Sequence, residues 1–280
     1  MFSRIIMLPF GLLAAFSLYR MAFYQDFFYT IILSGSVIII AGVLMLEKQI
    51  NLWWTAKKPP KTDPALKNFL YSYIPFYRGL PVPLRTEFER KLEIAESRMA
   101  VYSKTEKDLT DDVKTLSCIY PVILDFQTEL KLDKKYHHVV LYGHPFLSPE
   151  RMEHVHVSEF NQEDGVYIYS LEHLQLGFRS TQFFNIALYE AANAFLSLYK
   201  EGDKIEKHCE DRSQIFDLGS WTEKELAAYC GELPDVLPAL LIHHFFIFPE
   251  KVKEKLPEAY KTLTGIFGDY HVLSEKPFVY

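Results

Sequence analysis

The stretch FFNIALYEAANAFL, residues 183–196, decides how the rest of the chain is interpreted. It contains no Gly or Pro and is rich in Ala and Leu, so it predicts a buried helix of about four turns that continues to Tyr199. Three polar side chains, Tyr189, Glu190 and Asn193, interrupt the apolar surface. Because positions 189 and 193 are four apart, they share one face of the helix, with Glu190 beside them.

This polar group has the spacing of H-E-x-x-H, the motif in which two histidines of a helix bind zinc and the Glu activates a water. Glu190 is in place, but Tyr189 and Asn193 replace the histidines. A phenol with a pKa near 10 is a weak zinc ligand at neutral pH, and an Asn oxygen suits harder cations. We therefore expect no metal here, and we interpret Glu190 as a vestigial general base that needs hydrogen-bond partners.

Length and composition limit the class of protein. A chain of 280 residues can hold one good-sized domain plus an additional segment. The formal net charge of −6 excludes a basic nucleic-acid-binding surface, so no nucleic acid is expected as a partner. The three cysteines, Cys118, Cys209 and Cys230, form no C-x-x-C pair. This pattern favours free thiols in a reducing compartment over a disulfide framework or a zinc ribbon.

Two apolar runs near the N-terminus predict a membrane hairpin over residues 1–50. Residues 27–46 carry no charge and are long enough to cross a hydrocarbon core of about 30 Å as a helix. Residues 5–24 form a weaker second span, interrupted by Arg20, which can reach the interface. A signal peptide is the alternative interpretation of the first run, because Arg4 precedes it.

Basic residues predict the orientation of this hairpin. Four lysines follow the second run, whereas the turn between the runs holds only Arg20 and Asp26; the lysines are Lys48, Lys57, Lys58 and Lys61. The positive-inside rule then places both ends in the cytoplasm, which predicts an inner-membrane protein of a bacterium with its domain on the cytoplasmic side. Residues 51–68 predict a basic, Pro-containing linker in which Trp53 and Trp54 lie at the lipid interface.

Residues 69–270 predict an α+β domain, and residues 271–280 an irregular tail. Helices are expected over residues 83–101, from Thr110 to Phe126, and over 183–199, 234–248 and 250–267; strands are expected over 138–142, 154–158 and 166–170. A D-G turn separates the last two strands, and residues 200–220 are interpreted as a loop. Helix pairs around a small sheet are typical of the α+β class.

Several short segments, taken in this order, resemble the MtfA (Mlc titration factor A) family of zinc-dependent peptidases. They are Tyr77-Arg78-Gly79-Leu80-Pro81, Leu109-Thr110-Asp111-Asp112, Val139-Val140-Leu141-Tyr142, Tyr169-Ser170-Leu171 with Gly177, the Asn185 to Asn193 segment, and Ile242 to Lys251. The resemblance covers residues 70–268 and implies a zincin-like domain. It also implies that Tyr189 and Asn193 stand at histidine ligand positions, that His243 stands at the position of the third ligand, a Glu, and that Glu190 is the general base.

The resemblance and the predicted hairpin together leave three possible functions. The first is a membrane-anchored, catalytically inactive peptidase homologue without a cofactor, which binds a peptide or protein partner at the cytoplasmic face. In it, Tyr189, Asn193 and His243 are expected to form a hydrogen-bond network with Glu190 in place of the metal. The second is an active peptidase that retains zinc in an atypical site. The third is a structural subunit of a membrane complex, assembled through the hairpin.

The remaining histidines have simpler interpretations. His154 and His156 lie two apart on one strand, so they share a face, but no third ligand is near in the sequence and both are expected at the surface. His243 and His244 lie inside an apolar helix and are expected to be one core histidine and one surface histidine.

Overall fold

The computed structural model describes residues 2–24, 27–57, 63–105, 109–128, 131–148 and 151–270. The chain divides into two compact units, Met1–Lys61 and Thr62–Tyr280. The predicted tail over residues 271–280 lies outside the described residues, as does the Pro-containing part of the predicted linker, residues 58–62.

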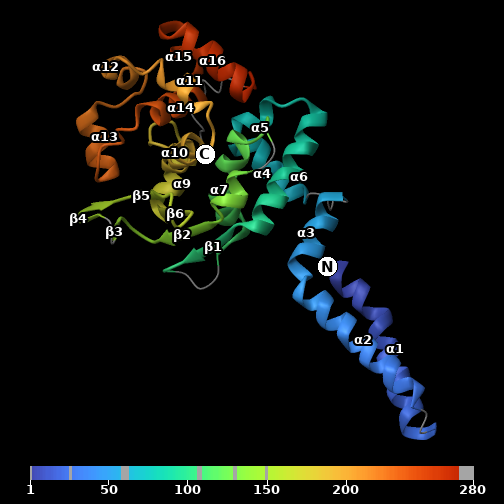
Figure 1. Ribbon diagram of the computed structural model, residues 1–280. Helices are drawn as coiled ribbons and strands as arrows, with labels where there is room; N and C mark the ends of the chain where they lie inside the picture. The colour runs from blue at the N-terminus through green and yellow to red at the C-terminus, as the bar shows by residue number, and fades with distance from the viewer. Residues whose placement is uncertain are drawn as a thin grey trace. The chain divides into compact units, whose positions relative to one another are not determined.

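The first unit is a helical hairpin. Helices α1 (Phe2–Tyr24) and α2 (Phe28–Met45) run side by side, and α3 (Glu47–Lys57) follows (Figure 1). Both α1 and α2 are long and apolar enough to cross a membrane, and only 6% of the apolar window of each is buried. The start of the predicted linker is therefore helical, because α3 extends over it. No side chain of α1 or α2 in the described residues is buried except three serines, Ser3, Ser17 and Ser36.

The second unit contains two small sheets. The larger sheet has the strand order β1 (Ala100–Ser103), β2 (His138–Tyr142), β6 (Val166–Ser170) and β5 (Ser158–Asn161). Strands β1, β2 and β6 are parallel, whereas β5 pairs antiparallel with β6 and forms an edge. The smaller sheet is the antiparallel pair β3 (Phe146–Ser148) and β4 (Arg151–His156) (Figure 1).

The strand predictions are confirmed over residues 138–142 and 166–170 and wrong at residues 154–158. The predicted strand is divided at Val157, which belongs to neither β4 nor β5. Its backbone N–H donates to the Cys230 carbonyl at 3.1 Å, and its own carbonyl accepts the Ser170 N–H at 2.7 Å. These tertiary bonds turn the chain from one sheet into the other. Strands β1 and β3 were not predicted, because each is too short for alternation to be read.

The helices of the second unit gather on one side of the larger sheet (Figure 1). They are α4 (Pro64–Tyr73), α5 (Pro75–Gly79), α6 (Val82–Arg98), α7 (Asp111–Leu124), α8 (Leu132–Lys135), α9 (Leu171–Arg179), α10 (Ile186–Leu198), α11 (Gly202–Glu206), α12 (Arg212–Phe216), α13 (Glu223–Cys230), α14 (Leu237–Ile247), α15 (Pro249–Lys255) and α16 (Pro257–Phe267). Mixed helix and sheet confirm the predicted α+β class. The prediction of a loop over residues 200–220 is wrong in part, because α11 and α12 lie there.

The core lies between the helices and one face of the larger sheet. Val139, Leu141, Tyr167 and Tyr169 alternate along β2 and β6 with half-buried neighbours, and all four are buried. Helix α10 contacts β5, α7 and α14, so it is the most central helix of the unit. The stretch that decides the interpretation of the sequence therefore also lies at the centre of the packing.

Candidate functional site

Asn185 sets the start of α10 and so the direction of every side chain on it. Its Oδ1 accepts the Leu188 N–H at 3.0 Å, which is an N-cap bond. Its Nδ2 donates to the Tyr120 hydroxyl at 2.6 Å and to the Gly177 carbonyl at 3.0 Å. Asn185 therefore ties α10 to both α7 and α9, which fixes where the polar group of α10 lies.

Glu190 lies beneath the surface, with 6% of its area exposed. Its Oε1 accepts the Ser158 hydroxyl at 2.7 Å, and its Oε2 accepts the Asn193 Nδ2–H at 3.0 Å. Ser158 is the first residue of the edge strand β5. Both carboxylate oxygens thus have protein donors, as a buried carboxylate requires. We call Glu190, Ser158 and Asn193 the Glu190 cluster.

Tyr189 is buried beside Glu190, and its hydroxyl bonds both to the Asn193 side chain and to the backbone before α14. The oxygen accepts the Val236 N–H at 3.3 Å, from the segment before α14. Burial, and then the Glu190 carboxylate, raises the pKa of the Tyr189 phenol above its usual range. The phenol therefore stays protonated at neutral pH.

His243 is fully buried on α14 and is held by neighbours other than Glu190. Its Nε2 accepts the Asn185 backbone N–H at 3.3 Å, and its Nδ1 lies 3.4 Å from Nδ1 of His244. The ring stacks on Phe184 with 4.4 Å between centroids. Burial, and then His244, lowers the pKa of His243 well below its usual range, so the ring is neutral.

The predicted network is therefore present in part. Asn193 bonds to Glu190 and to the Tyr189 hydroxyl, so Tyr189 is joined to Glu190 through Asn193, whereas His243 bonds to Asn185 instead. The second donor to Glu190 is Ser158, which sequence reasoning did not identify. Ser158 lies 32 positions before Glu190 in the sequence, on an edge strand, and no local sequence pattern predicts such a contact. In the described residues, no three His, Cys, Asp or Glu side chains gather as a metal site.

Two predictions about other histidines are also wrong. His156 is buried. Its Nε2 lies 3.0 Å from the carboxylate of Glu159, which is also buried, at the point where β4 leads into β5. His244 is 1% exposed, although it was expected at the surface. Burial, and then Lys251, lowers the pKa of His244 to about 3. His154 is exposed as predicted. All three cysteines are free and buried.

The Glu190 cluster holds a carboxylate between a hydroxyl and an amide, an arrangement that satisfies a buried charge. A general base must instead contact the water that it deprotonates. No protein-family model and no curated protein matches this chain. The relation to the MtfA family therefore stays a prediction, based on the segments quoted above.

Proposed function

We propose that this chain is a membrane-anchored, zincin-like protein whose domain binds a peptide or protein partner and has lost peptidase activity. The main support for this proposal is that both carboxylate oxygens of Glu190 accept hydrogen bonds, one from the Ser158 hydroxyl and one from the Asn193 side-chain amide. In the proposed relation, these donors occupy the carboxylate that would otherwise activate a water. Tyr189 and His243, at two of the ligand-equivalent positions, are likewise engaged by backbone N–H groups.

The exposed apolar surface of the hairpin supports the membrane anchor. Ile5 on α1 is 66% exposed and Ile38 on α2 is 71% exposed, and many other large apolar side chains of the two helices are also exposed. Such surface costs roughly 25 cal/mol per Å² in water, so an isolated hairpin of this kind favours lipid. The 18 residues of α2 reach roughly 27 Å, close to the hydrocarbon thickness.

Contacts within the hairpin support placing both of its ends on one side of the bilayer. The Ser3 N–H donates to Asn51 Oδ1 at 3.0 Å, and its hydroxyl donates to Glu47 Oε1 at 3.0 Å. The start of α1 therefore lies beside α3. Lys48 and Lys57 are at this end, which by the positive-inside rule favours the cytoplasmic face of the inner membrane.

Metal content and peptide release test the loss of activity. The full chain in lipid nanodiscs should contain far less than one zinc per chain by mass spectrometry. It should release no more peptide from an unfolded protein substrate than Glu190→Gln does. The proposal fails if zinc approaches one per chain and is lost in His243→Ala, or if Glu190→Gln abolishes a measurable peptidase activity.

A feature of the hairpin favours a second candidate function, a structural subunit of a membrane complex. A Cβ added to Gly35 or Gly42 would meet no atom within 4 Å. Small residues seven apart lie on one helix face and allow close approach of another membrane helix. Replacing residues 1–50 by an unrelated two-helix anchor separates the candidates, because only a binding domain should keep its partner after the exchange.

A further inference from the structure

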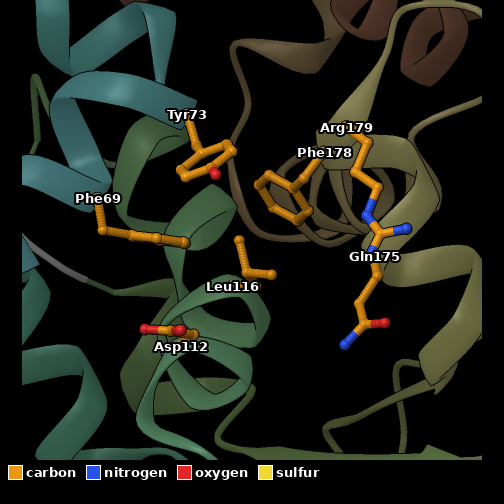
Figure 2. Close-up of a pocket in the computed structure, with 7 residues that line it drawn as sticks. All are labelled: Phe69, Tyr73, Asp112, Leu116, Gln175, Phe178 and Arg179. Atoms are coloured by element: carbon orange, nitrogen blue, oxygen red, sulfur yellow. The ribbon is translucent and has the colours of Figure 1, made fainter. Parts of the chain in front are cut away.

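A cavity of about 480 Å³ opens between α4, α7 and α9 (Figure 2). Its wall is mainly apolar and is formed by Phe69 and Tyr73 of α4, Leu116 of α7 and Phe178 of α9. This size and this lining are typical of sites for small molecules. The cavity shares no lining residue with the Glu190 cluster, so its occupant does not depend on whether peptidase activity has been lost.

One acidic, one basic and one amide side chain lie around this apolar wall. Asp112 lies on α7, and Gln175 and Arg179 lie one helical turn apart on α9. Figure 2 shows Asp112 across the cavity from Arg179, with Leu116 and Phe178 between them. Within the described ranges, the side chains of Asp112, Gln175 and Arg179 have no hydrogen bond or ion pair. They are therefore available to a ligand.

The wall of the cavity is rigid on its α9 side. Phe178 stacks on Tyr120 with 5.0 Å between centroids, and the Tyr120 hydroxyl accepts the 2.6 Å bond from Asn185. Gly177 packs so closely on Asn185 that an added Cβ would lie 2.9 Å from the Asn185 Cα. Phe178 is thus held in place before a ligand arrives, which lowers the cost of binding.

We propose that this cavity binds a short peptide with free ends and apolar side chains. The carboxylate end lies at Arg179 and Gln175, the ammonium end lies at Asp112, and the side chains cover Phe69, Leu116 and Phe178. Arg is the donor best suited to a carboxylate, and a group of opposite sign on the far wall selects a zwitterion over a simple anion.

Matched peptides test the charges at the two ends. The probes are Leu-Phe and Leu-Leu-Phe with 4-fluorophenylalanine, each with free ends, with an acetylated N-terminus, with an amidated C-terminus, or with both modifications. Binding to the full chain in nanodiscs is measured by ¹⁹F NMR line broadening, with empty nanodiscs as a blank. The free peptide of at least one length should bind roughly two- to five-fold more tightly than its singly modified forms, as expected for exposed charge pairs.

Two charge-removing variants assign each end. Arg179→Gln should abolish the preference for a free carboxylate and keep the preference for a free ammonium, and Asp112→Asn should do the reverse. Lys224→Gln, an exposed change on α13, is the matched control and should keep both preferences. The proposal is overturned if peptides of both lengths bind equally with free and modified ends, or if both preferences survive in both variants.

Discussion

The Glu190 cluster and the cavity between α4, α7 and α9 both present charged side chains beside apolar walls, but their surroundings are opposite. Glu190 is buried and both of its oxygens accept protein hydrogen bonds. Arg179 is exposed at the cavity and has no bonding partner among the described residues. Polar groups that bond to each other stabilise the fold, whereas polar groups without partners can bind something else. The motif-bearing helix therefore serves the core, and the less conspicuous helix α9 offers the binding groups.

This comparison predicts that the largest loss of stability follows from substituting Asn185, which links the two regions. Asn185→Ala removes the cap of α10 and the bonds to Tyr120 and Gly177. It should lower the free energy of unfolding by about 3 kcal/mol, from one lost cap and two unsatisfied buried groups. Urea unfolding of the full chain in detergent micelles, followed by near-ultraviolet circular dichroism, measures the change.

Asn68 supplies the control for this substitution. It is exposed on α4, so Asn68→Ala should change stability by no more than about 0.5 kcal/mol. Equal effects of the two substitutions would show that the bonds of Asn185 do not hold α10 in place.

The second largest change in the free energy of unfolding is expected from acid, which should destabilise the region around α14. The pKa of His244 is about 3 in the folded chain and about 6.5 when unfolded, so below pH 6.5 the unfolded chain binds more protons. The stabilisation is complete above pH 6.5 and is lost as pH falls toward 3, at about 1.4 kcal/mol per pH unit. The groups that set this shift are the surrounding apolar side chains and Lys251.

A comparison with His244→Phe measures this contribution together with the effect of His244 on His243, because the carboxyl groups titrate in both proteins. From pH 7.5 to pH 5, the wild-type chain should lose about 2 kcal/mol more stability than the variant. Parallel pH profiles from urea unfolding would mean that His244 titrates normally and is reached by water.

Within the Glu190 cluster, Ser158→Ala should have a smaller effect. It removes the 2.7 Å bond to Glu190 Oε1, and water can replace part of it because Ser158 is only half-buried. The expected loss is about 1 kcal/mol in the free energy of unfolding. Ser72→Ala, at an exposed position of α4, is the control and should be near neutral. If Ser158→Ala leaves the free energy of unfolding unchanged, the Ser158 hydroxyl does not stabilise the Glu190 cluster.

The smallest effect is expected at the cavity. Arg179→Gln should change the free energy of unfolding by no more than about 0.5 kcal/mol, because the side chain is exposed and forms no ion pair in the described part of the chain. Thermal unfolding of both proteins at one pH measures this. A loss above about 1 kcal/mol would make Arg179 part of the fold and would remove the contrast between the two regions.

Local patterns predicted the longest helices, which are α1, α2, α6, α7 and α10, but not the shorter helices α4, α5, α8 and α9. The helix predicted over residues 250–267 is divided at Pro257 into α15 and α16, and a capping box at Thr222 and Glu225 begins α13. Pro121 does not end its helix, because α7 continues to Leu124 within a buried core. Strand β1 was missed, since its four residues pair with β2 only after a long excursion of the chain. Tertiary pairing of this kind leaves no periodicity to detect.

The candidate site was predicted less well than the elements. Helical spacing correctly placed Asn193 beside Glu190, because residues three apart on a helix are neighbours. The same spacing could not show that His243 turns toward Asn185 or that Ser158 reaches Glu190. Those contacts depend on how β5 and α14 pack on α10. The cavity was not anticipated either, since its lining residues come from three helices that are distant in the sequence.

The sequence by itself determined the two apolar helices of the hairpin, the α+β class and the spacing of Tyr189, Glu190 and Asn193, since each depends on residues close together in the chain. Only the tertiary structure decided which donors satisfy Glu190, which histidines are buried and where an open cavity lies. Burial and hydrogen bonding across distant segments follow from packing, and packing brings together residues that no local spacing relates.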